Sequence, residues 1–403
     1  DYKNISQIAI DAESSNHAKL TADDYHVGCA LQTPILTAEI SSVPDYYQRF
    51  LDIILSTSPE SALQKISDSG LRGRGGAGFP TGFKWKSCRE VAGAEKYIVC
   101  NADEGDAGAY SDRYLLEERP HAVLFGMVMA GYLVGSQTGV LYIRDEYPAA
   151  IRETEKAISE FQSWLDSQLA AIQSSSAEST GWQFKFKIIR GAGAYICGEE
   201  TALLRSIEGQ RPVVSVRPPF PTQSGLFGCP TVLNNVETFA SIHYIFGDDN
   251  NTFSAMGNGK STGSKLISLD SSFVKSGIYE VAMGSPLVDV IKQAGGYSKT
   301  LKALHIGGPL GGVVPIEKVS DLTVDFESFA QAGFLLGHAS VIGIPEEFPV
   351  IEYMAHLFEF TADESCGKCY PCSLGSVRGK EMLEQAISGD KAIDKTLLNE
   401  LLE

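Results

Sequence analysis

Three cysteines lie close together near the end of the sequence, in the run ESCGKCYPC. Cys366, Cys369 and Cys372 stand at positions i, i+3 and i+6. Thiolates at this spacing are typical of an iron–sulfur cluster, which takes four such ligands, whereas a structural zinc site usually shows two separated cysteine pairs. Gly367 and Pro371 favour the tight turns that wrap a chain around a cluster. The segment therefore predicts an electron carrier; three reduced, buried cysteines without a metal are the alternative.

The fourth thiolate of such a cluster is not evident from the sequence. The remaining cysteines all lie well upstream in apolar or glycine-rich runs, where a lone cysteine is usually a small core residue: Cys29, Cys88, Cys100, Cys197 and Cys229. No cysteine follows Cys372 before Glu403. Either a distant cysteine completes the set, or the sequence stops before the fourth ligand. The uncapped ending KTLLNELLE, together with a first residue that is not Met, favours a chain trimmed at both ends.

A glycine-dense loop, SGLRGRGGAGFPTGFKW, occupies residues 69–85. Its core GRGGAG matches the G-x-G-x-x-G pattern, but an expected helix precedes it where the dinucleotide fingerprint requires a strand. The loop's backbone can still approach a ligand closely, and its cations suit a phosphate. Its candidate binding residues are Gly73, Arg74, Gly75, Gly76, Gly78 and Lys84, with Phe79, Phe83 and Trp85 as candidates to stack on an aromatic ring. A flexible surface loop with basic residues is the alternative.

Four further segments carry polar or aromatic residues beside expected strands and helices. The acidic loop NADEGDAG, the turn GAGAYICGEETALL, the rigid stretch RPPFP and the turn NNVET supply Asn101, Asp103, Glu104, Asp106, Tyr195, Gly198, Glu199, Glu200, Phe220, Asn234 and Asn235. A carboxylate can hold a ribose diol and can repel a 2′-phosphate by its charge. A structural role at a helix N-terminus is the alternative for Glu199, Glu200 and Asn234.

Composition limits the remaining possibilities. The chain has 403 residues, 43% hydrophobic residues and a net charge of −17. This charge argues against nucleic acid and against an anionic membrane surface as partners. The longest apolar stretch, at 122–135, is too short to span a bilayer, so no direct membrane insertion is expected. The seven histidines show no metal-binding spacing.

The pattern of expected strands and helices predicts an α/β protein of several units. We expect an N-terminal arm at 1–44, an α/β binding domain at 45–250, a small β-grasp-sized domain at 251–345, and a helical domain that carries the cysteines at 346–403. Apolar residues at helical spacing fill 44–69, with Gly70 as a helix end. Strands are expected at 97–100 and in GVLYIRDEY.

Taken together, the six motifs SGLRGRGGAGFPTGFKW, CNADEGDAG, RGAGAYICGEETAL, RPPFPTQSGLFG, PTVLNNVET and ESCGKCYPC are far more specific than any one alone. In this order they closely resemble the NADH-binding flavoprotein subunit of respiratory complex I, the 51-kDa type. The same family includes the diaphorase subunits of soluble NAD-linked hydrogenases and formate dehydrogenases. The resemblance covers about residues 45–403.

The resemblance implies a Rossmann-like domain for FMN and NADH, a β-grasp domain and a helical bundle with a [4Fe–4S] cluster. FMN is expected across Gly73, Arg74, Gly75, Lys84, Asn101, Asp103, Glu104, Tyr195, Gly198, Glu199, Asn234 and Asn235. NAD(H) is expected to stack on the flavin, with adenine near Phe79 and Phe220 and with Glu200 and Asp106 toward the ribose or carboxamide. Cys366, Cys369 and Cys372 are expected to hold the cluster, whose fourth ligand in the family falls beyond Glu403. Asp106 replaces a common Glu, and Ser87 stands where some members have an aromatic; both differences predict a looser nucleotide contact.

The implied activity is hydride exchange between NAD(H) and FMN, followed by one-electron transfer through the cluster to partner subunits. The implied partners are a small [2Fe–2S] thioredoxin-like subunit and a larger iron–sulfur subunit. The implied location is the cytoplasm, or the matrix or cytoplasmic side of a membrane complex. The sequence leaves open whether the parent assembly is complex I, a hydrogenase or a formate dehydrogenase. A cluster-bearing module without catalysis remains the alternative of a different class.

Overall fold

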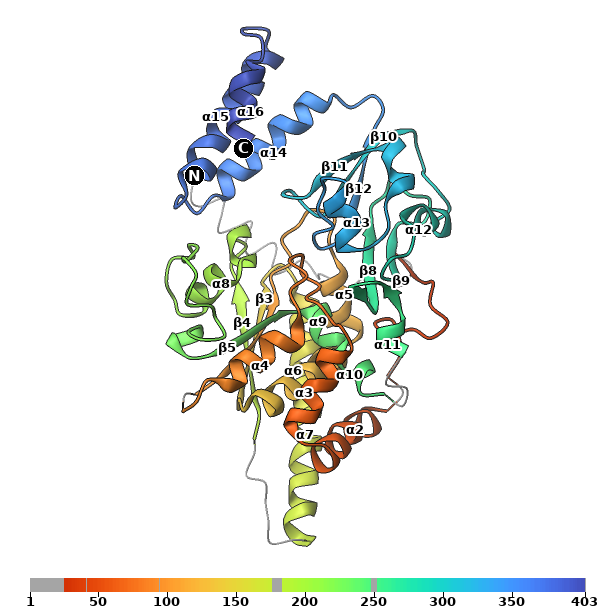
Figure 1. Ribbon diagram of the computed structural model, residues 1–403, viewed down its shortest axis with the longest axis vertical. Helices are drawn as coiled ribbons and strands as arrows, with labels where there is room; N and C mark the ends of the chain where they lie inside the picture. Colours follow the sequence, from red (N-terminus) through yellow and green to blue (C-terminus); the bar gives the residue numbers. More distant parts are fainter. Residues whose placement is uncertain (1–24, 41, 94, 176–182, 248–251, 403) are drawn as a thin grey trace.

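The computed structural model describes residues 25–40, 42–93, 95–175, 183–247 and 252–402 (Figure 1). Within these ranges the chain forms a four-stranded sheet with its helices, a six-stranded sheet, and a group of C-terminal helices. Most of the expected N-terminal arm, residues 1–24, lies outside the described residues. Among the described residues, no helix combines the length and apolar character needed to cross a bilayer.

The first sheet is parallel throughout. Its strands are β2 (Tyr97–Ala102), β3 (Thr138–Arg144), β4 (Lys185–Gly191) and β5 (Thr231–Asn235), in the order β4-β3-β2-β5. The strands predicted at 97–100 and in GVLYIRDEY are confirmed. Because parallel strands place their carboxyl ends at one edge, the segments that follow β2, β4 and β5 all begin at the same edge of the sheet.

Helices cover both faces of this sheet, and the apolar residues of its strands alternate between two cores. Ile98 and Cys100 face the larger core, while Val99 packs with Leu203 and Leu204 on the other side. The helices are α2 (Val43–Ser56), α3 (Pro59–Asp68), α4 (Thr81–Glu90), α5 (Ser111–Glu118), α6 (Pro120–Val134), α7 (Pro148–Ser175), α8 (Glu200–Ile207), α9 (Val236–Ala240) and α10 (Ile242–Ile245). A sheet buried on both faces needs the near-continuous apolar runs that β2 and β3 show.

The helical stretch predicted at 44–69 is two helices rather than one. Ser58 accepts a hydrogen bond from the Ser61 backbone N–H at 3.2 Å and so caps α3, while Pro59 occupies its first turn. Proline lacks the N–H that a continuous helix would need, so the chain breaks here and begins again. Gly70 follows α3 with a φ of +70°, in agreement with the predicted helix end.

The second sheet is mixed, in the order β1-β9-β8-β12-β10-β11 (Figure 1). Its strands are β1 (His26–Cys29), β8 (Ser264–Leu269), β9 (Gly277–Ala282), β10 (Leu301–Ile306), β11 (Gly312–Pro315) and β12 (Ser340–Pro345). The shorter elements around it are α11 (Thr252–Ala255), β6 (Gly257–Asn258), β7 (Ser261–Thr262), α12 (Leu287–Gln293), the 3₁₀ helix η3 (Ile316–Asp321) and α13 (Phe326–Gln331). A separate apolar core, formed by residues between Ile267 and Val341, supports this second unit.

Residues from the predicted N-terminal arm join the second sheet. Strand β1 pairs in parallel with β9. The Glu280 carboxylate, fully buried on β9, accepts the backbone N–H groups of Ile35, Leu36 and Thr37 at 2.8–3.1 Å. The hydroxyls of Thr37 and Ser264 also donate to it, each at 2.7 Å. Three consecutive N–H groups that point at one carboxylate hold this segment against the sheet.

The C-terminal part is helical, as predicted. It contains α14 (Val350–Glu364), α15 (Tyr370–Ile387) and α16 (Lys395–Leu402), which lie together at one end of the molecule (Figure 1). The cysteine loop connects α14 to α15, and Cys369 is the N-terminal capping position of α15.

The Glu280 contacts generate a stability prediction. Replacing Glu280 with Gln removes the charge and leaves a buried N–H without its acceptor, so the free energy of unfolding should fall by about 2–4 kcal/mol in urea denaturation. The control variant Glu347→Gln, at an exposed position, should leave it within about 0.5 kcal/mol. Equal stability of the two variants would contradict this account of the segment at 35–37.

Candidate functional site

Four of the predicted segments meet at the carboxyl edge of the parallel sheet. The Asn101 side-chain amide donates to the Gly198 carbonyl at 2.8 Å, which joins the acidic loop to the second glycine-rich turn. The Lys84 ammonium donates to the Leu233 carbonyl at 2.9 Å. The Trp85 indole N–H donates to the Asn234 side-chain oxygen, also at 2.9 Å. Residues more than 90 positions apart in the sequence therefore share one site.

The glycine-rich loop folds back on itself and lies between the two units. The Gly73 N–H donates to the Phe79 carbonyl at 2.8 Å and closes the loop. Gly76 has a φ of +122°, which an L side chain rarely adopts. A methyl group built on Gly75 would lie 3.0 Å from Asn235 Cβ, so the loop runs close to the end of β5.

Arg72 fixes this loop to the second unit. Its Nε donates to the Gly78 carbonyl at 2.5 Å, and its Nη1 pairs with Glu327 at 2.5 Å. The guanidinium also lies 4.6 Å from the centroid of the Phe326 ring, within the range of a cation–π contact. The loop is thus held by α13 as well as by its own backbone.

Three buried polar atoms in these segments have no hydrogen-bond partner among the described residues. The Arg74 side chain is fully buried, and its Nε and Nη1 atoms have no hydrogen-bond partner within the described part of the chain. Burial lowers the pKa of Arg74 to about 10, which leaves it charged at neutral pH. Asp103 Oδ2 is likewise buried without a partner among the described residues, and burial raises the pKa of Asp103 to about 7. A cation and an acceptor of this kind fit a phosphorylated, hydroxyl-bearing ligand such as FMN.

The other carboxylates predicted to bind ligands differ in their surroundings. Glu104 is buried and accepts from the backbone N–H groups of Asp112 and Arg113, at 3.0 and 3.1 Å, so its charge lies at the start of α5. Asp106 accepts from the Tyr195 hydroxyl at 2.7 Å. Glu199 caps α8 through the N–H groups of Thr201 and Ala202, in agreement with the structural alternative.

Glu200 lies within a small group of charges. Arg217 pairs with one of its oxygens at 2.5 Å, and the Lys84 ammonium lies 3.7 Å from the other. Burial lowers the pKa of Lys84, and the Glu200 charge opposes this shift. The cations of Arg217 and Lys84 therefore offset the negative charge of Glu200.

The aromatic candidates divide into buried and accessible rings. Trp85 is fully buried against Phe239, so its assignment as a stacking ring is wrong: its position on the inner side of α4 places it in the core. Phe79, 47% exposed, and Phe83, 62% exposed, form an edge-on pair 5.8 Å apart. Phe220 is half exposed in the PPFP turn. These three rings remain accessible for stacking on a ligand.

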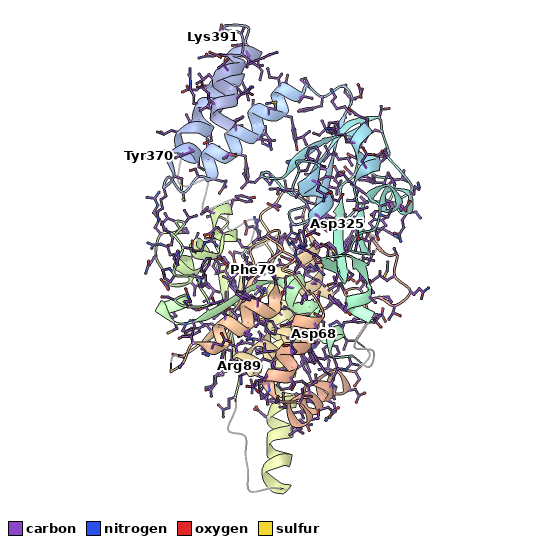
Figure 2. The ribbon with its side chains drawn as sticks, viewed as in Figure 1. Asp68, Phe79, Arg89, Asp325, Tyr370 and Lys391 are labelled. Carbon is purple, nitrogen blue, oxygen red and sulfur yellow. The ribbon has the colours of Figure 1, made fainter. Side chains whose placement is uncertain are left out.

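The cysteine loop lies at the surface, beside the segment that follows α8, where the Lys368 ammonium donates to the Val214 carbonyl. Cys369 and Cys372 are exposed and Cys366 is half buried. Backbone hydrogen bonds from the Val214 and Lys368 regions outweigh the effect of burial and lower the pKa of Cys366, which favours a thiolate. Figure 2 shows Tyr370, next to Cys369, on the helical part, and Phe79 in the middle of the molecule.

Tyr195 connects the two regions. Its backbone N–H donates to Glu364 on α14 at 2.9 Å, and its ring lies 5.0 Å from that of Phe360. The same side chain holds Asp106 in the acidic loop. Helix α14, which precedes the cysteine loop, therefore contacts Tyr195, a predicted FMN-binding residue.

One buried cluster was missed by the sequence reasoning. Glu104, Asp112 and His338 bring their polar atoms within 4.8 Å of one another, and all three are buried. His338 lies 226 residues from Asp112 in the sequence and belongs to the second unit. No local spacing connects these residues, so only the packing of the two units reveals them.

Comparison with known proteins supports this interpretation of the site. Residues 66–244 match a family model described as the Nuo51 FMN-binding domain. Residues 352–403 match the model of the NADH-ubiquinone oxidoreductase-F iron–sulfur binding region, of the [4Fe–4S] type.

Relatives that align with most of the chain agree with these matches. The chain is 40% identical over 339 residues to the HndC subunit of an NADP-reducing hydrogenase of Solidesulfovibrio fructosivorans, covering 83% of this chain and 68% of that protein. It is 41% identical over 321 residues to the F 2 subunit of an NADH-quinone oxidoreductase of Rhizobium meliloti, covering 79% and 75%.

A crystal structure of an air-oxidized NAD⁺-reducing [NiFe]-hydrogenase superimposes with a TM-score of 0.79 at 31% identity. The alignment covers 96% of this chain but only 63% of that one. The chain therefore belongs to the oxidoreductase flavoprotein family of the NADH-quinone oxidoreductase F subunits and their hydrogenase relatives, with an FMN-binding domain and a [4Fe–4S] region.

Proposed function

We propose that this chain is an NADH:acceptor oxidoreductase subunit that exchanges hydride between NAD(H) and FMN and delivers electrons through its [4Fe–4S] cluster to partner subunits. The observation that carries this proposal is that hydrogen bonds join the glycine-rich loop, the acidic loop and the segments after β4 and β5 at one edge of the sheet. In these segments, Arg74 Nε and Nη1 and Asp103 Oδ2 are buried without a hydrogen-bond partner among the described residues. Bound FMN supplies the conversion between two-electron and one-electron chemistry.

The residues of the site bind and orient rather than react. The buried guanidinium of Arg74 and the ammonium of Lys84 offer donors to anionic groups of FMN. The Asn101 amide can donate or accept, and the Asp103 carboxylate can accept, hydrogen bonds with the hydroxyl groups of FMN. Gly198 leaves its neighbourhood open, because a Cβ there would meet only the Asp103 carbonyl, at 3.5 Å. Phe79 and Phe220 are the expected contacts for adenine.

We also propose the identity of each structural unit and of the partner subunits. The four-stranded unit corresponds to the Rossmann-like FMN and NADH domain, and the six-stranded unit to the β-grasp domain. Cys366, Cys369 and Cys372 supply three thiolates of the cluster. The expected partners are a thioredoxin-like [2Fe–2S] subunit and a larger iron–sulfur subunit, in a complex I, hydrogenase or formate dehydrogenase assembly on the cytoplasmic or matrix side.

The first test is the flavin itself. The native chain, or its complex, should contain FMN, and NADH should bleach the flavin absorbance and support ferricyanide reduction. The variant Asp103→Ala should lose most of its FMN, because a buried acceptor disappears, while Asp166→Ala on α7 should retain it. Native protein without any flavin would contradict the proposal.

A second prediction concerns the choice of nucleotide. Glu200→Gln removes the charge that Arg217 now pairs with, so Arg217 becomes available to a 2′-phosphate. The ratio of kcat/KM for NADPH to that for NADH should rise roughly ten- to a hundredfold, as expected for about 1–3 kcal/mol. The exposed control Glu155→Gln on α7 should leave the ratio unchanged; an unchanged ratio in Glu200→Gln would remove Glu200 from nucleotide selection.

A third prediction separates the cluster from the flavin. Cys369→Ser should abolish the EPR signal of the reduced cluster, because a serine oxygen is too hard a ligand for iron–sulfur chemistry. FMN should remain reducible by NADH, whereas electron delivery to partner subunits should fail. The control Cys229→Ser, in the loop before β5, should retain the signal. A Cys369→Ser protein that still reduces its natural partner would exclude these cysteines as the exit route.

A further inference from the structure

His338 enters the first unit from a constrained turn of the second unit. It precedes β12 between Gly337, with a φ of +54°, and Ala339, with a φ of +65°. A non-glycine residue in the left-handed region is strained and persists only where its surroundings require it. A Cβ on Gly337 would lie 2.4 Å from the Gly307 carbonyl oxygen, so this turn has little freedom.

Each ring nitrogen of His338 lies near a buried carboxylate. Nε2 lies 3.1 Å from Asp112 Oδ2. Nδ1 lies 3.3 Å from Ser111 Oγ, whose hydroxyl donates to Glu104 Oε1 at 3.3 Å. Nδ1 also lies 3.6 Å from Glu104 Oε1, so a buried carboxylate lies within ion-pair distance of each ring nitrogen. Two carboxylates in this arrangement stabilise the imidazolium form, which donates from both nitrogens.

A metal ion and a proton compete for this cluster, whose ligand atoms lie within 4.8 Å of one another. A metal would need the lone pair of one ring nitrogen, and an imidazolium has none to give. The imidazolium form places one cation between the two buried carboxylates of Glu104 and Asp112. Such a group is a charge-paired network, and its response to Zn²⁺ distinguishes it from a metal site.

Asp112 connects His338 to Asn235, a predicted FMN-binding residue at the end of β5. Its Oδ2 accepts from the Asn235 side-chain amide at 2.6 Å, and Asn235 Oδ1 in turn accepts the Glu237 N–H at 2.9 Å. We propose that His338 is a positively charged positioning residue: through Asp112 it joins the second unit to the first and fixes Asn235 beside the glycine-rich loop. Its effect on FMN rests on the proposed function above.

The charges around His338 determine its pH dependence. Asp112 on α5 and Glu104 after β2 raise the pKa of His338 to about 9, although burial opposes them. Lys265 on β8, itself paired with Glu237 on α9, lowers it. A folded pKa above the unfolded value near 6.5 means that the stabilisation is complete below pH 6.5 and is lost as pH rises through about 9.

The first measurement observes the proton directly. In the full chain labelled with ¹⁵N-histidine, the resonances absent from His338→Gln should show both ring nitrogens protonated at about pH 7.5, with a transition near pH 9. His243 provides the matched control, because burial lowers its pKa to about 4 and it should be neutral. A neutral His338 at that pH, or resonances that shift with Zn²⁺ and return with EDTA, would overturn the proposal.

The second measurement follows stability. The unfolding equilibrium constants of the wild type and His338→Gln should differ most at about pH 6.5, and this ratio should shrink by up to about a hundredfold by about pH 9.5. The corresponding ratio for His243→Gln should stay nearly constant, since a neutral histidine gains no charge interaction. A pH-independent effect of His338→Gln would mean that its packing, not its charge, matters, and would overturn the charge assignment.

The third measurement tests positioning. FMN affinity at about pH 7.5, measured from quenching of FMN fluorescence by the flavin-depleted full chain, should weaken about tenfold in His338→Gln and not in His243→Gln. Unchanged affinity in His338→Gln, beside an intact imidazolium in the wild type, would overturn the positioning role. Failure of the wild type itself to bind FMN would instead contradict the proposed function and leave the charge assignment standing on the first two measurements.

Discussion

The parallel pairing of β4, β3, β2 and β5 is the constraint on which the site depends. Parallel strands deliver every following segment to one edge, so the acidic loop after β2, the turn after β4 and the asparagines that end β5 meet without any local sequence signal. The Asn101–Gly198 and Lys84–Leu233 hydrogen bonds then hold these segments in place. If one of these strands ran antiparallel, the segment that follows it would begin at the opposite edge of the sheet.

The second unit completes the site from the opposite side. Arg72 reaches α13 through Glu327, and His338 reaches α5 through Asp112, so charged contacts join the two units on either side of the glycine-rich loop. The buried Lys265–Glu237 pair adds a third such contact. Losing one partner of a buried pair is costly, so these contacts favour a fixed arrangement of the units.

The sequence predicts those parts of the structure that local pattern controls. Apolar runs and turn residues identified β2, β3 and the helix that leads into the cysteines, and glycine and charge content identified the binding loops. The break between α2 and α3 was missed although Pro59 signals it, because the apolar spacing continues across the proline. Trp85 was misassigned because residue type alone does not say which side of α4 is buried.

Features that depend on long-range packing were beyond the sequence. The Glu280 carboxylate meets residues about 245 positions away, and His338 meets Asp112 across 226 positions. Glu199 is a short-range example. Its sequence context allows either a ligand contact or a helix cap, and only the direction of its carboxylate distinguishes the two roles. The relatives indicate the chemistry, but the contacts within this chain show which side chains are available to take part.

Hydrogen–deuterium exchange of the full chain with and without FMN tests the central claim most directly. The account predicts that FMN slows exchange together in residues 73–84, 101–106, 195–200 and 234–235, whose backbone amides lie at the carboxyl edge of the sheet, while the amino ends of β2 and β3 are unchanged. Protection by FMN elsewhere in the chain, with these four segments unaffected, would contradict it.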